Sequence, residues 1–428
     1  MQLDIAIVGS GIAGLGAAYL LNRRHRIEVF EQADYPGGHA HTVDAEAADG
    51  PQPVDTGFIV YNEVNYPHFT RLLAELQVAS IPSNMSFGAH CPETGFAYSS
   101  RGLRGLFATP RNAGSPAFHR MLRDILRFNK MARHALDHGE EGDDTLDEFL
   151  RHHGFSDYFV RYYISPMSAA IWSAPAGRTL AFPAMTFFRF FKNHGLLSVR
   201  PDIPWRTVRG GSREYVRAMT RTFSDRIHLH TPVRQIRRTD SQVRLSFDDG
   251  PDRLFDRVVL AVHADQALRL LQDPSDDERR LLAHFPYQPN RVVLHDDATV
   301  LPRRRAAWAS WNVRIPPADA GEQPLTMSYH MNRLQAIPGP TPYLVTLNPD
   351  VAWRRTMDGR PGHHVFFETD YDHPLYGTGS FRVQPEFATL NGRRQTCFCG
   401  AYTGYGFHED GLASGLQAAR ALGVEWTS

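Results

Sequence analysis

Three glycines near the N-terminus have the spacing that a diphosphate-binding turn requires. Gly9, Gly11 and Gly14 directly follow a short apolar run at residues 3–8, which is typical of a strand buried on both faces. Residues 12–24 then carry apolar side chains at helical spacing. In such a unit the first glycine permits a tight turn, the second lets a diphosphate approach the backbone, and the third lets the helix pack closely on the strand. The spacing therefore predicts a dinucleotide site at the end of the first strand.

The start of the helix and the end of a second strand complete this predicted site. Ile12 and Ala13 begin the helix, where free N–H groups and the positive end of the helix dipole attract phosphate. Residues 27–31 predict a second strand ending at Glu31, whose carboxylate would accept the ribose hydroxyls of an adenosine and repel a 2′-phosphate. We assign Gln32, the next residue, to the same site. Such a βαβ unit predicts a Rossmann-like domain that binds the adenosine diphosphate of NAD or FAD.

A second glycine-containing stretch favours a flavin over a nicotinamide. Gly37, Gly38 and His39 lie shortly after the predicted second strand. Nicotinamide dehydrogenases have no general need for a glycine pair there, whereas a flavoprotein must follow the longer FAD past its diphosphate. A further approach point is formed by Thr56, Gly57 and Phe58. Because no second GxGxxG occurs, we expect no separate domain for NADH or NADPH.

These stretches resemble the flavin-containing amine oxidase and phytoene-desaturase superfamily. Similar stretches recur along the rest of the chain, at residues 205–215, 227–236, 255–263, 396–401 and 406–415. The resemblance implies non-covalent FAD. It also implies an α/β fold, in which a Rossmann-like FAD-binding domain of the GR2 type carries an inserted α+β substrate domain.

The resemblance further implies how the two domains divide the chain. The FAD-binding domain would be discontinuous, made of residues 1–62, 205–280 and 385–428. The substrate domain would be made of residues 63–204 and 281–384. The first of these insertions has mostly helical patterning, and the second contains alternating runs that are typical of strands.

The resemblance places additional residues at the cofactor. Val233 would pack against the adenine, while Gly400 and Glu409 belong to the C-terminal strand–helix unit that meets the flavin. The chain departs from the family pattern at His39, since the family often has an arginine after the glycine pair and the charge of a histidine depends on pH. The acidic residue that commonly follows the C-terminal glycine is also absent, because Ala401 stands there.

His408 and Tyr402 are the candidate catalytic residues. Counting back from Gly411, His408 stands nearest the position where the family places a side chain over the flavin. A neutral imidazole there could act as a base or donate a hydrogen bond. A capping or packing role at the start of the helix explains His408 equally well. Tyr402 lies in the same connection between the last strand and the last helix.

The resemblance also implies an apolar substrate. The stretches GGHAHT, MSAAIWS and GYGFHEDGL are similar to bacterial proteins that are commonly encoded beside cyclopropane fatty acid synthases. This implies an unsaturated or modified fatty acyl chain as substrate, with dehydrogenation or isomerisation by hydride transfer to flavin N5, and such a synthase as partner. An amine oxidase, or a non-catalytic flavin-bound partner of the synthase, remains an alternative. Amine oxidases usually keep a lysine near flavin N5, and this chain offers only Lys130 and Lys192.

The phenylalanine-rich stretch 182–194 has two interpretations. Its pattern fits a helix in the protein core. It also fits the lining of a hydrophobic tunnel, or a membrane-facing opening with Arg189, Lys192 and His194 at the level of the lipid headgroups.

Composition limits the remaining classes of function. The formal net charge is zero, which gives no sign of nucleic-acid binding. No stretch reaches the about twenty apolar residues of a membrane span. The three cysteines lack CxxC spacing, so we expect a reducing cytoplasmic location, with peripheral contact at the inner membrane left open. His39 and His41 have no third ligand nearby in the sequence, and we expect no metal site.

Overall fold

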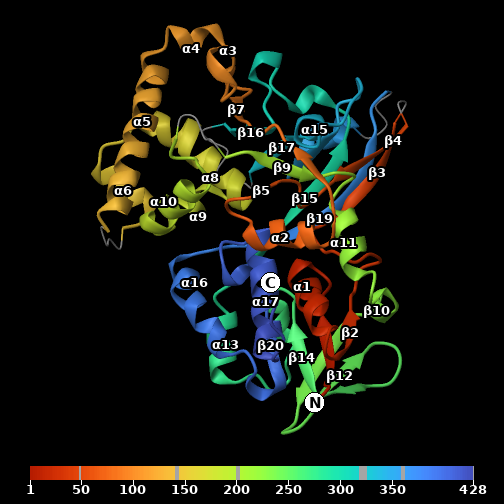
Figure 1. Cartoon of the computed structure of the whole chain (residues 1–428). Coiled ribbons are helices and arrows are strands. Elements are labelled where there is room, and N and C mark those ends of the chain that lie inside the picture. Colours follow the sequence, from red (N-terminus) through yellow and green to blue (C-terminus); the bar gives the residue numbers. More distant parts are fainter. Residues whose placement is uncertain (48–49, 140–143, 199–202, 318–324, 358–361, 428) are drawn as a thin grey trace.

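The strands around the first glycine stretch form one parallel sheet. In the computed structural model, which describes residues 1–47, 50–139, 144–198, 203–317, 325–357 and 362–427, the order of this sheet is β10-β2-β1-β14-β20. Its strands come from separate parts of the chain: β1 (Asp4–Val8), β2 (Arg26–Phe30), β10 (Ile227–His228), β14 (Arg257–Leu260) and β20 (Thr396–Phe398). The order reverses between β1 and β14, which is where doubly wound sheets bind ligands. Figure 1 shows this sheet in the lower half of the molecule.

Two helices pack closely against each other beside this sheet. They are α1 (Ile12–Leu21) and α17 (His408–Ala421). A Cβ added at Gly415 would lie 2.2 Å from the carbonyl oxygen of Ala13, so only glycine permits this approach. A Cβ at Gly411, in the first turn of α17, would lie 2.8 Å from the side chain of Ile12, the first residue of α1. The N-termini of the two helices therefore lie side by side.

A three-stranded antiparallel sheet follows β10 in the chain. It consists of β11 (Val233–Arg238), β12 (Val243–Phe247) and β13 (Arg253–Phe255). The stretch 227–236 forms the two strands β10 and β11, because the chain turns between them at His230, whose φ is +50°.

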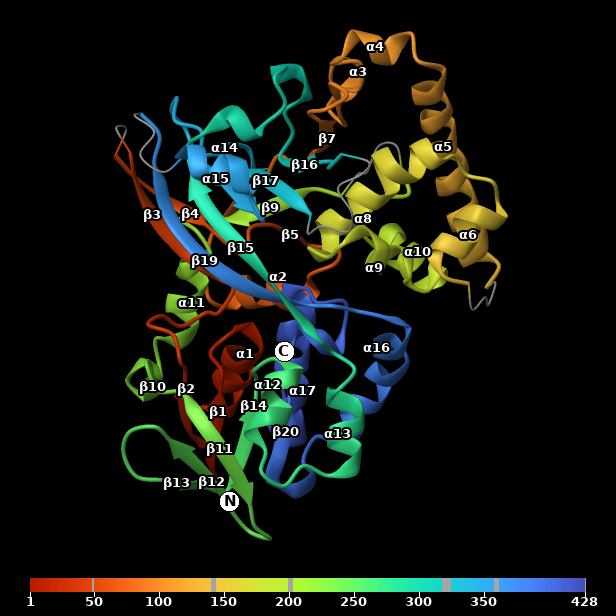
Figure 2. The same cartoon turned by 180° about the vertical axis from the view of Figure 1, so that it is seen from behind.

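A mixed sheet of seven strands lies beyond the carboxyl ends of the parallel strands (Figures 1 and 2). Its order is β19-β15-β18-β17-β16-β7-β8. The strands are β7 (Phe87–Cys91), β8 (Phe96–Ser99), β15 (Tyr287–His295), β16 (Trp311–Arg314), β17 (Thr326–His330), β18 (Leu344–Leu347) and β19 (Val365–Pro374). The alternating runs recognised in the second insertion form β17 and β18.

Shorter elements connect the strands of these sheets. Two small sheets are made of β3 (Thr42–Ala47) with β4 (Gly50–Asp55), and of β5 (Tyr61–Asn62), β9 (Trp205–Val208) and β6 (Ser80–Pro82). The connecting helices are α2 (Pro67–Glu75), α11 (Arg213–Thr220), α12 (Ala264–Leu270), α13 (Asp276–Leu282), α14 (Met331–Leu334), α15 (Val351–Met357) and α16 (Thr378–Val383).

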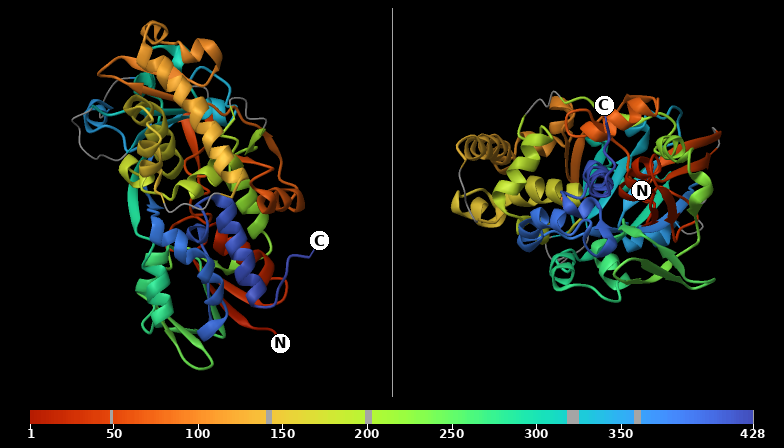
Figure 3. Two further views of the ribbon diagram at one scale, coloured as in Figure 1. Left: turned by 90° about the vertical axis from the view of Figure 1, so that its left-hand side faces the viewer. Right: turned by 60° about the horizontal axis from the view of Figure 1, so that its bottom comes forward.

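The remaining helices form a lobe to one side of the strands, as the right-hand view of Figure 3 shows. They are α3 (Gly102–Leu106), α4 (Pro110–Ala113), α5 (Pro116–Asp137), α6 (Leu146–His152), α7 (Asp157–Phe159), α8 (Ser165–Trp172), α9 (Ala176–Leu180) and α10 (Ala184–Asn193), with one π-helical turn, η1 (Val160–Ile164), before α8. Among the described helices, none has the length and apolar character that a membrane span requires.

Helix α10 shows that the phenylalanine-rich stretch belongs to the core. Phe187 and Phe191 are 0% exposed, and Phe188 is 1% exposed. The Phe188 ring packs edge-to-face on Phe128 and Phe149, with ring centroids 5.6 and 4.9 Å away. The interpretation as a membrane-facing opening is therefore wrong for these rings, because the helical lobe covers them on every side.

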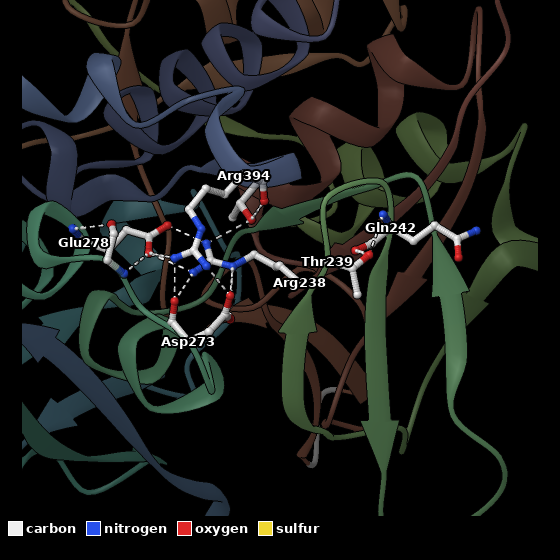
Figure 4. Close-up of polar contacts among 8 residues, drawn as sticks. Arg238, Thr239, Gln242, Asp273, Glu278 and Arg394 are labelled. Carbon is white, nitrogen blue, oxygen red and sulfur yellow. Dashed lines mark hydrogen bonds and ion pairs between the residues drawn. The ribbon is translucent and has the colours of Figure 1, made fainter.

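A buried ion network joins three of these elements (Figure 4). Arg238 at the end of β11 is 1% exposed at its side chain and donates to both carboxylate oxygens of Glu278 in α13, which is 4% exposed. Its Nη1 also lies 3.3 Å from Thr396 Oγ1 at the start of β20. Asp273 accepts from Arg238 Nε at 3.2 Å and from Arg394. The network therefore anchors α13 and the last strand of the parallel sheet to the antiparallel sheet.

Candidate functional site

Each of the three glycines after β1 is required for a different reason. Gly9 has a φ of +99°, which only glycine adopts without strain. A Cβ at Gly14 would lie 2.0 Å from the carbonyl oxygen of Gly9, so α1 could not approach the turn with any other residue there. A Cβ at Gly11 would meet nothing within 4 Å. The space above Gly11 is therefore open to a ligand.

The N-terminus of α1 presents its N–H groups to the same space. Its N-cap is Gly11, no described side chain caps it, and its first turn contains no acidic residue. By contrast, Ser115, Thr145 and Ser275 cap the helices α5, α6 and α13 with their side chains. The uncapped N–H groups and the helix dipole of α1 suit an anion from outside the chain.

Glu31 lies where the sequence places it and also fixes the turn. It follows directly on β2, and its Oε2 accepts hydrogen bonds from the backbone N–H and the hydroxyl of Ser10 at 2.9 and 2.7 Å. Its Oε1 accepts from the N–H of Ala33 at 2.9 Å. A carboxylate has about four acceptor positions, so one remains for a ribose hydroxyl. Gln32 is exposed beside it.

The second glycine stretch lies against the first. The N–H of Gly37 donates to the carbonyl oxygen of Ser10 at 2.9 Å. Gly38 has a φ of +58°, and a Cβ there would lie 3.1 Å from the Cα of Gly11. The residues 37–39 therefore form one wall of the space above Gly11.

Residues 56–58 are bonded to this wall. The N–H of Phe58 donates to the carbonyl oxygen of His39 at 2.7 Å, and a Cβ at Gly57 would lie 2.2 Å from the same oxygen. The Thr56 hydroxyl lies 2.8 Å from the hydroxyl of Tyr371 in β19. The stretch thus connects the glycine turn to the seven-stranded sheet.

Val233, the predicted adenine contact, lies on the side of the site formed by β2. It is 8% exposed at the start of β11 and pairs with Phe247 in β12. The Phe247 ring is tilted against that of Phe30, the last residue of β2, with centroids 5.1 Å apart. Glu31 follows Phe30 directly, so Val233 and the Glu31 carboxylate border the same end of β2.

His408 is held by aromatic rings at the start of α17. Its ring stacks on Phe58 with centroids 3.7 Å apart and an interplanar angle of 9°. Its Nε2 lies 2.9 Å from the hydroxyl oxygen of Tyr215, and the tautomer decides which of the two donates. Burial, with a smaller effect of His39, lowers the pKa of His408 to about 3. The imidazole is therefore neutral at pH 7.

The second catalytic candidate, Tyr402, does not join this group. It is 1% exposed, and its ring packs between Phe285 and Phe387, each with centroids 5.4 Å away. A Cβ at Gly400 would lie 2.4 Å from the Tyr402 ring, so Gly400 makes room for it. The structure thus gives Tyr402 a packing role beneath the turn, and it leaves His408 as the catalytic candidate.

Glu409 also has a different role from the one expected. Its Oε1 accepts from the N–H of His68 at 2.8 Å, and its Oε2 accepts from the N–H of Phe69 at 3.0 Å. Both oxygens therefore bond to the N-terminus of α2, and Oε1 also lies 2.6 Å from Nδ1 of His68. The next carboxylate, that of Asp410, accepts from the N–H groups of Tyr405 and Phe407. Burial outweighs these bonds and raises the pKa of Asp410 to about 6.

Residues 12–354 match the family described as flavin containing amine oxidoreductase, which is more than half of the chain. The chain belongs to this family. It is therefore an FAD-dependent oxidoreductase. No curated protein sequence matches it with significance.

Solved structures confirm the fold of this oxidoreductase. Cyclohexylamine oxidase from Brevibacterium oxydans superimposes with a TM-score of 0.68 at 17% identity, covering 99% of each chain. A CLA-producing fatty acid isomerase from P. acnes gives 0.66 at 17% identity, covering 96% of each chain. A variant of putrescine oxidase gives 0.68 at 17% identity, covering 99% of each chain. At these sequence identities the similarity establishes the fold. The substrate has to be inferred from the residues of the site.

The residues present fit FAD. The open space over Gly11, the uncapped N-terminus of α1 and the carboxylate of Glu31 are what the diphosphate and ribose of FAD need. The flavin end would then lie toward residues 56–58 and the start of α17, because the glycine stretches lead in that direction. The chain supplies no lysine there, since Lys130 and Lys192 are both exposed on the helical lobe.

Three residues that position the site were not identified from the sequence. Asp55 accepts from Thr42 and Ser212 at 2.6 and 2.8 Å, and its other oxygen accepts from Gln335 at 2.9 Å. Tyr215 holds His408, and His373 in β19 stacks on His39. Asp55 could have been identified from the sequence, because it directly precedes Thr56, which the sequence assigned to the site. Nothing local marks Tyr215 or His373, which reach the site only through tertiary packing.

Proposed function

We propose that this oxidoreductase acts on an apolar substrate, an unsaturated or modified fatty acyl chain, by dehydrogenation or isomerisation. The observation that carries the proposal is the character of one face of the seven-stranded sheet. Successive residues of a strand point to opposite faces, and the cross-strand pairs Trp311–Tyr329 and Val313–Met327 share one face of β16 and β17. Val313 and Met327 are buried in one core cluster with residues of η1 and α8. The face toward the helical lobe is therefore apolar.

Aromatic side chains extend this apolar face. Tyr163, Trp311 and Tyr329 are partly buried and pack against the same core cluster. Burial raises the pKa of Tyr163 to about 12 and also raises that of Tyr329. Trp311 packs edge-to-face on Tyr329 with centroids 5.5 Å apart. A wall of neutral aromatic rings suits an acyl chain, because each buried methylene contributes about 0.8 kcal/mol.

A surface groove offers an access route toward His408. It has a volume of about 730 Å³ and lies where the starts of α2 and α17 meet the end of α10. Tyr405 and Phe407 line it, and Phe407 directly precedes His408. The Phe407 ring stacks on Phe190 with centroids 5.1 Å apart. An acyl chain could therefore enter along aromatic side chains.

Charge argues against an amine as the preferred substrate. A diamine needs a carboxylate for its second ammonium group; at the groove Glu409 already pairs with His68 at 2.6 Å, and burial raises the pKa of Asp410 to about 6. The fatty acid isomerase among the similar structures shares this fold and supports the feasibility of acyl chemistry on it.

In this proposal His408 acts as the proton acceptor. FAD, when bound, supplies a hydride acceptor at flavin N5. Removal of a hydride from an acyl CH–CH unit leaves one proton to be taken up by the protein. His408 is neutral, and in the tautomer whose Nε2–H donates to the hydroxyl oxygen of Tyr215, Nδ1 carries the lone pair that accepts the proton. Phe58 fixes the plane of the imidazole ring.

The affinity for fatty acids should rise with chain length. Burial of the chain against apolar side chains predicts a decrease in Kd of about fourfold for each added methylene, until added methylenes are no longer buried. We would measure this by titrating the FAD-loaded protein with a series of unsaturated fatty acids and following the perturbation of the flavin absorbance. Putrescine serves as the comparison ligand. A Kd independent of chain length, together with tight binding of putrescine, would contradict the proposal and favour amine oxidation.

A further inference from the structure

The walls of the FAD site contain histidines that face one another. His39 stacks on His373 of β19 with ring centroids 5.5 Å apart and an interplanar angle of 15°. It also interacts electrostatically with His263, the N-cap of α12, and with His408 of α17. Tyr371 packs edge-to-face on it at 4.7 Å. His39 therefore interacts with each of the other three imidazoles, those of His263, His373 and His408.

Among the residues that the structure describes, none supplies a counter-charge for His39. Burial lowers the pKa of His39 to about 4, with a smaller contribution from His263. In the described part of the chain no carboxylate forms an ion pair with His39. The acidic group that acts on this cluster is Asp265, which raises the pKa of His263 only in part and pairs with Arg269. The protein without cofactor therefore keeps these imidazoles neutral near pH 7.

The diphosphate of FAD would bring the missing counter-charge. Gly38, the residue before His39, lies against Gly11, over which the open space for the diphosphate lies. An anion close to an imidazole favours its protonated form and raises its pKa. The chain has no arginine at this position, so a permanent cation does not already fill the role.

We propose that His39 takes up a proton when FAD binds, so that the protein holds its cofactor through an imidazolium formed on binding. The sign of the pH dependence follows. Between its pKa without FAD and its higher pKa with FAD, His39 is neutral before binding and charged after it. The affinity for FAD is then greatest at low pH and falls as the pH rises toward the pKa of the complex.

The neighbouring histidines limit the uptake to one proton. His39 lowers the pKa of His373 and of His408 by repulsion, so a charge on His39 disfavours a second charge nearby. Burial, with a smaller contribution from His39, lowers the pKa of His373 to about 3. One diphosphate therefore charges one imidazole of the cluster.

The test is the pH dependence of FAD binding to the apoprotein. We expect the Kd, measured by quenching of flavin fluorescence, to rise with pH by up to about tenfold per unit between about pH 5 and pH 8. Calorimetry in two buffers of different ionisation enthalpy should show uptake of close to one proton. ADP-ribose, which carries the same doubly esterified diphosphate, should give the same slope, and riboflavin, which has no phosphate, should give none.

Three variants make the assignment specific to His39. H39R keeps a permanent charge and H39Q keeps none, so both should bind FAD with a Kd that does not change with pH. The control is H41Q, because His41 already lies 3.1 Å from the Thr56 hydroxyl and stacks on Tyr35. H41Q should retain the slope of the wild type. A flat wild-type profile, an H39Q protein that keeps the slope, or a slope with riboflavin would overturn the proposal.

Discussion

Replacing Gly11 with alanine should leave a folded protein that has lost most of its affinity for FAD. Gly11 has a φ of −66° and a ψ of 178°, which alanine adopts freely, and a Cβ there meets no protein atom within 4 Å. The added methyl group instead occupies the space of the diphosphate. Overpacking of about 2 kcal/mol would weaken FAD binding about thirtyfold. The measurement is the Kd of the apoprotein for FAD, together with its thermal midpoint.

Gly14 provides the matched comparison for this experiment. In Gly14→Ala the new methyl group would meet the backbone of Gly9 at 2.0 Å and cannot be accommodated without moving α1. We expect this variant to lose both thermal stability and FAD. If Gly11→Ala instead bound FAD like the wild type, the space over Gly11 would not be the diphosphate site.

Replacing Glu278 with glutamine should destabilise the protein by about 3 kcal/mol, because it leaves the buried guanidinium of Arg238 without its main counter-charge. The measurement is the free energy of unfolding of the FAD-free protein in denaturant. The double variant Arg238→Met/Glu278→Leu is the control, because replacing both partners by apolar side chains removes the buried charges together. A double variant as unstable as the single one would show that the loss does not come from the unpaired guanidinium of Arg238.

The same network makes a prediction about pH. Burial acts to raise the pKa of Glu278, but the bonds from Arg238 and Ser275 outweigh it and hold the pKa below its usual value. A lowered pKa in the folded state means that the carboxylate stabilises the protein above the pKa of the unfolded chain, about 4.3. The stability difference between wild type and Glu278→Gln should therefore shrink as the pH falls below about 4.

The parts of the site that could be predicted are those governed by local chemistry. Gly9 must be glycine because of its φ of +99°, and Gly14 because a Cβ there would lie 2.0 Å from the carbonyl oxygen of Gly9; Glu31 follows from the length of one βαβ unit. Such constraints leave a fixed spacing in the sequence. The alternation in residues 325–331 and 343–347 predicted strands for a similar reason, since a half-buried strand has a period of two.

The incorrect assignments concern residues whose partners lie far away in the chain. Glu409 stands at the start of α17, yet it caps α2, which begins more than three hundred residues earlier. Tyr402 lies in the connection between the last strand and the last helix, which the sequence assigned to the cofactor site. Its ring instead packs in the core against Phe285 and Phe387. The apolar pattern around Phe188 fits a core helix and a tunnel wall equally well. Only tertiary packing distinguishes these possibilities.

The proposed substrate class is tested most directly by mixing the FAD-loaded protein with substrate in the absence of oxygen. A long-chain unsaturated fatty acid should bleach the visible flavin band or be recovered with a shifted double bond, and putrescine should do neither. His408→Gln should keep FAD but slow the reaction about a hundredfold. Bleaching by putrescine, with the fatty acid unchanged and the flavin unaffected by it, would contradict the proposal that this oxidoreductase acts on acyl chains.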